Sequence, residues 1–133
     1  MILKGNGNCA RLPSRRREFP TVFVIGFPLA GRPFYTAPRG TDGAAQSFDL
    51  LFHGVEVTTG GQRLHHREDL ENALRKRGMG PHSFESLIRM FDLGMPPHGG
   101  LAIGLERLTA QVLGLQNIRE AVLYPRDRNR VTP

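Results

Sequence analysis

Cysteine is nearly absent from this 133-residue chain, which contains only Cys9. A single thiol cannot form an internal disulfide, and it cannot by itself build a cysteine-based zinc site. No apolar run approaches the roughly 20 residues of a membrane-spanning helix, and residues 1–10 lack the apolar stretch of a signal peptide. We therefore expect a cytoplasmic protein whose fold is stabilised by packing or by a partner.

Acidic residues are also in deficit, with 12 Asp and Glu against 18 Lys and Arg, which gives a net charge of +6. The excess lies at the two ends, because residues 21–118 carry nine basic and nine acidic side chains. Basic ends can attract the phosphates of nucleic acids, but they are also common as solvated termini. The middle of the chain is therefore neutral, and we favour the second interpretation for the ends.

The length fits one domain preceded by an arm. Residues 1–20 combine glycine, proline and an arginine run without helical or strand periodicity, which predicts a basic, irregular arm. Ordered structure is expected from about Thr21, so that residues 21–133 form the domain.

Three short runs of β-branched and aromatic residues predict strands. They are residues 21–25, expected to be buried, residues 47–52 and residues 55–58. Gly54 indicates a tight turn between the last two, which therefore predict an antiparallel hairpin or a tightly bent pair. This turn allows the carboxylates of Asp49 and Glu56 to converge. The glycine- and alanine-rich residues 39–45 predict a flexible connection.

Apolar residues spaced three and four apart predict three helices. The helices are residues 66–77, a segment from the N-cap Ser83 to about Gly94, and a segment from Gly104 to Gly114. Their apolar faces are Leu70, Ala73 and Leu74, then Phe84, Leu87, Ile88 and Phe91, and finally Leu105, Leu108 and Val112. Glu71 and Arg75 are expected to pair at i,i+4. Residues 117–122 predict a short helical turn or strand.

An acidic residue, hydroxyls, paired glycines and an arginine fall within the eight residues from Glu56 to Arg63. The oxygens of Glu56 and Thr59 suit Mg²⁺, which keeps bound waters and bridges to substrate phosphates. Arg63 can bind a carboxylate through two parallel hydrogen bonds. The structural alternative is a cross-strand ion pair with a bulge at the two glycines, and this segment alone favours it.

A glycine-rich turn leads into a helix that begins Gly104-Leu105-Glu106-Arg107. The free backbone N–H groups of a helix start attract anions, and the guanidinium of Arg107 adds a forked positive charge suited to polyphosphate oxygens. The structural alternative is a helix packed closely on a strand, with both charged side chains in solvent. Spacing alone favours that alternative.

Longer stretches of the sequence resemble a known family. Residues 96–108 read PPHGGLAIGLERL, and residues 114–120 and 124–128 read GLQNIRE and YPRDR. These stretches resemble the third signature motif of class II aminoacyl-tRNA synthetases, in the form of the archaeal-type aspartyl enzymes. Residues 27–28, 32–36, 47–50 and 60–65 are similar to the same family in the same order. The resemblance covers residues 20–133.

The resemblance implies a site for aspartate and for Mg²⁺ that accompanies the substrate ATP. Glu56 would bind the metal and ATP, and Asp49 would assist at the metal. Thr59 would touch both the metal and aspartate. Arg63 would hold the side-chain carboxylate of aspartate, which selects aspartate over asparagine.

The resemblance also implies the second half of the site and the reaction. Arg107, with the backbone of Gly104, Leu105 and Glu106, would bind the triphosphate end of ATP. Glu56 and Arg107 would then be the catalytic residues. In the family, aspartate attacks the α-phosphate of ATP, and the aspartyl group of the resulting adenylate is transferred to tRNA.

The fold implied by the resemblance is α+β, a partial class II antiparallel sheet with packed helices. Leu101, Ala102 and Gly26 depart from the family pattern, which usually has an aromatic residue, a glycine and an aspartate there. The first and second motifs and the anticodon-binding domain are absent from the chain. We therefore expect a truncated aspartyl-tRNA synthetase catalytic domain that is inactive alone.

Three further hypotheses remain open. The chain is either a non-catalytic paralogue that acts as a binding or regulatory module, or one half of a split enzyme; an amide-forming relative of the asparagine synthetase kind is more remote. Missing strands are expected to leave an unpaired sheet edge and apolar surface, which predicts a homo-oligomer or a complementary chain. ATP and aspartate are the implied partners, and contact with tRNA is left open.

Overall fold

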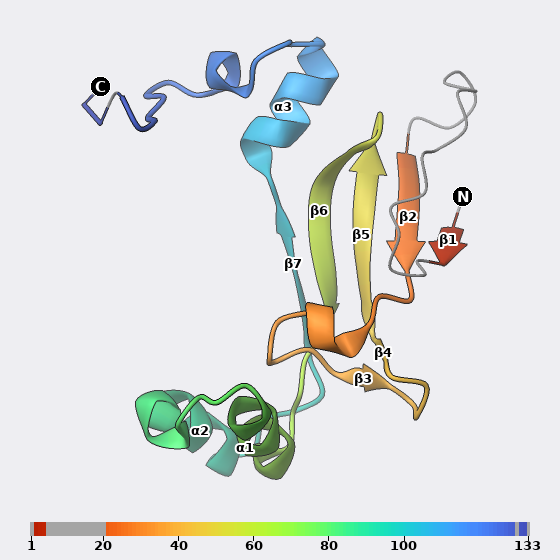
Figure 1. The fold of residues 1–133 in the computed structure, drawn as a ribbon, viewed down its shortest axis with the longest axis vertical. Coiled ribbons are helices and arrows are strands. Elements are labelled where there is room, and N and C mark those ends of the chain that lie inside the picture. The colour runs from red at the N-terminus through yellow and green to blue at the C-terminus, as the bar shows by residue number, and fades with distance from the viewer. Residues whose placement is uncertain (1, 5–20, 130, 133) are drawn as a thin grey trace.

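The fold is a five-stranded sheet with helices at its two ends. The computed structural model describes residues 2–4, 21–129 and 131–132. The strands are β1 (Ile2–Lys4), β2 (Thr21–Ile25), β5 (Ser47–Phe52), β6 (Val55–Gln62) and β7 (Gly99–Ile103), in the order β1-β2-β5-β6-β7. β1 pairs with β2 in parallel, and the other neighbours pair antiparallel. Figure 1 shows α1 and α2 at the lower end of the sheet and α3 at the upper end. The predicted α+β class is confirmed.

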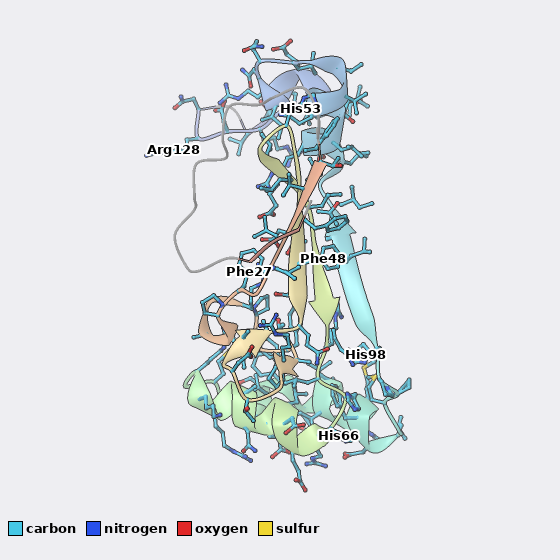
Figure 2. All side chains as sticks on the ribbon, turned by 90° about the vertical axis from the view of Figure 1, so that its right-hand side faces the viewer. Phe27, Phe48, His53, His66, His98 and Arg128 are labelled. Atoms are coloured by element: carbon cyan, nitrogen blue, oxygen red, sulfur yellow. The ribbon has the colours of Figure 1, made fainter. Side chains whose placement is uncertain are left out.

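The hairpin of β5 and β6 forms as predicted, with a two-residue turn. His53 and Gly54 have φ values of 50° and 85°, the left-handed conformations that a type I′ hairpin turn requires. Figure 2 places His53 at the hairpin tip, far from His66 and His98 at the other end of the molecule. β6 runs to Gln62, four residues beyond the predicted end, because its second half pairs with both β5 and β7.

The predicted strand at residues 21–25 forms but is only half-buried. In β2, Val22 is 6% exposed, whereas Phe23 is 43% exposed. The predicted irregular arm is wrong for Ile2–Lys4, which form a strand through their parallel pairing with β2. The rest of the arm, residues 5–20, lies outside the described residues.

Residues 39–45, predicted as a flexible connection, contain paired strand residues and a turn. β3 (Pro38–Arg39) pairs with β4 (Ala44–Ala45), and both alanines are buried. Asp42 holds the turn between them, since it accepts hydrogen bonds from the Arg39 guanidinium at 2.7 Å and from the Ala44 N–H at 3.0 Å. These bonds lower the pKa of the Asp42 carboxyl, chiefly through the Arg39 guanidinium.

Helices α1 (Arg67–Lys76) and α2 (Glu85–Asp92) form a small helical unit around a core of their own. Leu70, Leu74 and Ile88 are buried there, and Phe34 from the β-sheet side packs against them. The predicted apolar faces and the Glu71–Arg75 ion pair, at 2.6 Å, are confirmed. The predicted N-cap Ser83 is wrong, because Pro81–Phe84 form a 3₁₀ turn and α2 begins at Glu85.

Helix α3 (Leu105–Leu113) begins after Gly104 and ends at the left-handed Gly114, as predicted, and Ile118–Ala121 form a 3₁₀ turn. The expected apolar face of α3 is largely uncovered, since Leu105 and Val112 are 68% and 65% exposed and Leu108 is partly buried. Among the described strands β7 is a sheet edge, as predicted, and its Leu101 and Ile103 are also exposed. Oligomerisation through this edge stays a prediction. None of the helices in the described part of the chain has the length and apolar character needed to cross a membrane.

Candidate functional site

A bulge in β6 decides which side chains share one face of the sheet. The cross-strand pairs on either side of it are Leu50–Thr58 and Leu51–Glu56. Val57 is therefore an extra residue with no partner on β5, and it reverses the alternation of side chains along the strand. Glu56 and Thr59 are three residues apart and would otherwise point to opposite faces. Because of the bulge they lie on the same face as Asp49, the partner of Thr59.

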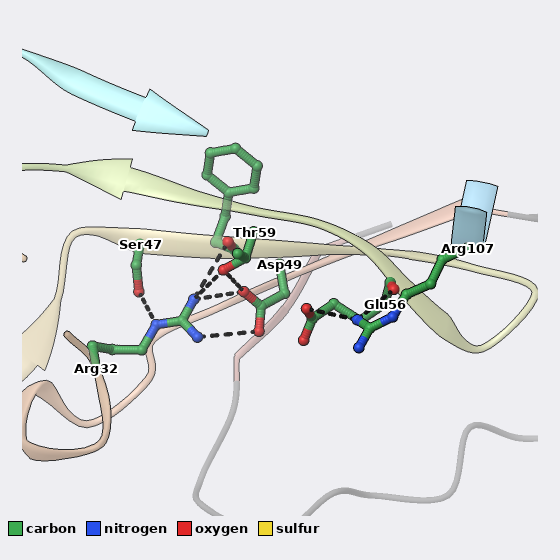
Figure 3. A network of polar contacts seen from close by, with 7 residues as sticks. Arg32, Ser47, Asp49, Glu56, Thr59 and Arg107 are labelled. Carbon is green, nitrogen blue, oxygen red and sulfur yellow. Dashed lines mark hydrogen bonds and ion pairs between the residues drawn. The ribbon is translucent and has the colours of Figure 1, made fainter. Parts of the chain in front are cut away.

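On this face, Arg32 and Asp49 form a two-bond ion pair (Figure 3). Arg32 Nη2 lies 2.6 Å from Asp49 Oδ1, and Nη1 lies 3.3 Å from Oδ2. Arg32 Nε donates to Ser47 Oγ at 2.9 Å, and the Thr59 hydroxyl donates to Asp49 Oδ1 at 2.6 Å. The guanidinium carbon of Arg32 also lies 4.1 Å from the ring centroid of Phe27. Asp49 is buried, so this pairing supplies the counter-charge that a buried carboxylate requires.

Arg63 follows the end of β6, where its backbone is held from two sides. Its N–H donates to the carbonyl of His98 at 2.9 Å, and it forms an isolated bridge with Thr36. Its guanidinium carbon lies 5.1 Å from the ring centroid of Tyr35. The guanidinium also covers Gly100, where an added Cβ would lie 2.7 Å from Nη2. Gly100 therefore leaves the space that the Arg63 side chain occupies.

A cavity of about 130 Å³, here called the two-arginine cavity, is lined by both Arg32 and Arg63, and by Thr59. Its volume is below the roughly 300–1,000 Å³ of pockets for drug-sized ligands, so it suits a molecule of amino-acid size. Within the described residues, Arg32 is paired with Asp49, whereas Arg63 has no carboxylate partner. The cavity therefore has one compensated and one uncompensated guanidinium, and the second attracts an anion.

Glu56 and Arg107 are in contact at the start of β6, near the hairpin turn (Figure 3). Arg107 Nη1 donates to the Glu56 carbonyl at 3.2 Å and to Glu56 Oε1 at 3.3 Å. Both side chains are about half exposed, at 51% and 44%. The N–H of Gly104 donates to the carbonyl of the bulge residue Val57 at 2.8 Å, which fixes the start of α3 beside this pair.

The structure brings Glu56 and Arg107 together but places Arg63 elsewhere. Neither Glu56 nor Arg107 lines the two-arginine cavity. Seven positions of extended chain separate Glu56 from Arg63 in the sequence, which corresponds to roughly 20 Å. A ligand that touches both places must be elongated. The backbone of Gly104, Leu105 and Glu106, which was predicted to bind the triphosphate, lies at the start of α3, on the same side as Arg107.

The Glu56 carboxylate can serve as a ligand for a magnesium ion that phosphates also bind. Mg²⁺ usually takes one or two carboxylates and keeps several waters. The Glu56 side chain is exposed, and its contact with Arg107 involves Oε1. Asp49, in contrast, is buried and accepts hydrogen bonds on both oxygens. No three His, Cys, Asp or Glu side chains gather into a cluster within the described ranges. The metal roles of Asp49 and Thr59 stay predictions.

Sequence reasoning assigned no role to Arg32, although the structure places it at the centre of the polar network. It is the single charged residue in the apolar stretch 27–38, and this isolation was a usable signal. The position of the bulge in β6 also differs from the one considered from the sequence. The alternative considered from the sequence put a bulge at Gly60 and Gly61, which instead pair regularly with β5 and β7.

Comparisons with known proteins identify the family of the chain. The family described as tRNA synthetases class II (D, K and N) matches residues 8–128. The aspartate–tRNA(Asp/Asn) ligase of Thermus thermophilus is 54% identical over 112 residues, which are 84% of this chain and 26% of that protein. This chain therefore spans about a quarter of the length of that curated relative.

Solved structures give the same result. The aspartyl tRNA synthetase from Entamoeba histolytica matches with a TM-score of 0.81 and 40% identity, over 86% of this chain and 24% of that one. Asparaginyl-tRNA synthetase from Pyrococcus horikoshii complexed with asparaginyl-adenylate matches with a TM-score of 0.80 and 34% identity, over 85% and 27% of the two chains. The family resemblance predicted from the sequence is confirmed, and the chain belongs to the class II tRNA synthetases of the D, K and N group.

Proposed function

We propose that this chain supplies the aspartate-binding and triphosphate-binding face of an aspartyl-tRNA synthetase catalytic domain. In this proposal aspartate occupies the two-arginine cavity, and the triphosphate of ATP lies beside Glu56 and Arg107. The relatives named as aspartate–tRNA ligases support the substrate class. Residues 21–133 would belong to the catalytic domain.

The observation that carries the proposal is the uncompensated guanidinium of Arg63 beside a small cavity. A carboxylate on the ligand completes a charge-assisted, two-bond pair with it. An amide of the same shape presents an NH₂ group to the same guanidinium, so one donor faces another and the cation stays unpaired. Aspartate is therefore favoured over asparagine.

Arg32 and Asp49 support this selection without adding net charge. Their mutual pairing keeps the Arg32 guanidinium in place, while Thr59 holds the Asp49 carboxylate from β6. A fixed, neutral pair forms one wall of the cavity, so the positive charge available to a ligand comes from Arg63.

The triphosphate end is proposed to exchange the Glu56–Arg107 contact for contacts with the nucleotide. Arg107 turns to phosphate oxygens, and the N–H groups of the first turn of α3 add the positive end of the helix dipole. Glu56 would hold Mg²⁺ together with the phosphates, and the ion would neutralise part of the charge of the triphosphate.

The two places together suit adenylate formation. An oxygen of the aspartate α-carboxylate attacks the α-phosphorus, the bond from that phosphorus to the bridging oxygen breaks, and pyrophosphate leaves. The aspartyl group then passes to a hydroxyl at the tRNA 3′ end, with AMP as the leaving group. This chain contributes positioning and charge stabilisation to these steps.

Adenylate formation is inferred to need residues of the longer relatives beyond the matched quarter. The described residues supply one side of the proposed active site. The exposed apolar side chains of β7 and α3 are suited to packing against another segment of polypeptide. We expect the 133-residue chain alone to show no measurable ATP–pyrophosphate exchange. Robust exchange by the purified chain would contradict this inference.

Replacement of Arg63 tests the aspartate proposal. We expect Arg63→Ala to weaken aspartate binding by roughly 10- to 100-fold, because a charge-assisted pair is lost. Isothermal titration calorimetry with aspartate and with asparagine checks this, and the unaltered chain should prefer aspartate. Arg89→Ala, an exposed arginine of α2, is the control and should bind like the unaltered chain. Equal aspartate affinity in Arg63→Ala and the control would show that the carboxylate clamp is wrong.

Two glycines that line the two-arginine cavity differ in what an added methyl group would meet. In Gly100→Ala the new methyl group meets the flexible end of Arg63, so we expect weaker aspartate binding with stability retained within about 1 kcal/mol. In Gly61→Ala the Cβ would lie 2.5 Å from the Gln46 carbonyl oxygen, so we expect a loss of roughly 1–3 kcal/mol. Urea unfolding and aspartate titration of both variants give the comparison. Unchanged aspartate affinity in Gly100→Ala would contradict the proposed position of Arg63.

A further inference from the structure

The end of helix α1 is joined to the candidate site by one side chain. Arg77 is the residue that follows the last turn of α1, and its Nη2 donates a hydrogen bond to the backbone carbonyl of Arg32. The two residues are 45 positions apart in the sequence. This contact therefore links the helical unit to the polar network on the sheet.

The carbonyl that Arg77 binds belongs to the residue whose side chain makes one wall of the two-arginine cavity. Arg32 follows a short 3₁₀ turn, and its N–H donates to the Leu29 carbonyl at 3.1 Å. With its N–H and its carbonyl both bonded, the backbone of Arg32 has a defined position. The Arg32 guanidinium therefore loses less conformational entropy when it binds Asp49 and Ser47.

The space around this link is not filled by packed side chains. A cavity of about 580 Å³ lies between residues 29–38 and α1, and Arg77 is part of its wall. Phe34 attaches the segment to the helical core on one side. Arg77 spans the gap next to Arg32, while α1 itself is held by the fully buried Leu70 and Leu74.

We propose that Arg77 is a positioning residue for the amino-acid site. By holding the Arg32 carbonyl against the end of α1, it keeps the Arg32 guanidinium on Asp49 and so fixes the shape of the two-arginine cavity. Its effect on aspartate rests on the proposed function, whereas its effect on Arg32 does not. A residue that served only to end α1 would change helix stability and leave the Arg32 side chain where it is.

Nuclear magnetic resonance of the arginine side chains tests the link directly. The Nε–H of Arg32 donates to Ser47 Oγ, so its signal reports whether the guanidinium is in place, and its absence from Arg32→Lys assigns it. We expect Arg77→Ala to shift this signal and to speed its exchange with water about threefold to tenfold, the range for one hydrogen bond. Arg77→Lys, which keeps a donor, should restore part of the protection.

Arg75→Ala is the matched control, because Arg75 lies on the same helix and pairs with Glu71. It should leave the Arg32 signal unchanged. An unchanged signal in Arg77→Ala as well would overturn the proposal. Should Arg77→Ala not fold, the same signal in Arg77→Met, a long side chain without an N–H donor, decides in the same way.

Aspartate titration of the same variants separates this inference from the proposed function. We expect Arg77→Ala to bind aspartate about threefold to tenfold more weakly than Arg75→Ala, with partial recovery in Arg77→Lys. If the unaltered chain binds no aspartate, the proposed function fails, and the Arg32 signal still decides the role of Arg77. If aspartate binds equally to all variants, the positioning role is wrong.

Discussion

The geometry of the site depends on one extra residue in β6. Val57 reverses the alternation of side chains, so Thr59 and Glu56 lie on the face that carries Asp49. The carbonyl of Val57 also accepts the N–H of Gly104, which places the start of α3 beside the same strand. A regular β6 would keep its hairpin turn but would separate these groups onto two faces. The bulge therefore builds both ends of the site from a single strand.

Charge compensation distinguishes the two arginines of the cavity. Arg32 is neutralised by Asp49 within the fold, and it serves as a wall. Arg63 has no such partner in the described part of the chain, and it is left for an acidic ligand. A site that had paired both arginines internally would have no net charge for a carboxylate, and one that had paired neither would bind anions without regard to shape. In the proposed function, this asymmetry would allow a small cavity to discriminate between an acid and its amide.

Local patterns in the sequence were sufficient for the hairpin turn at Gly54, the two-helix unit and the limits of α3. Each of these rests on residues within a few positions of one another. The last four residues of β6 were missed because Gly60 and Gly61 do not read as a strand, although residues 59–61 pair with both β5 and β7. Arg32 was missed because its partners Ser47 and Asp49 lie 15 and 17 positions later, on β5. The bulge at Val57 was missed because no glycine marks it. The family resemblance named Glu56, Arg63 and Arg107 as site residues, but their division between two places became visible only in three dimensions.

The central claim is that one sheet face holds an amino acid and a triphosphate at two separate places. Chemical-shift mapping of the isotope-labelled chain, titrated separately with aspartate and with ATP and Mg²⁺, tests it most directly. The account predicts that aspartate shifts the backbone signals of residues 59–63 and 100–102, whereas ATP with Mg²⁺ shifts those of residue 56 and residues 104–107. Shifts of one common set of residues by both ligands would contradict it.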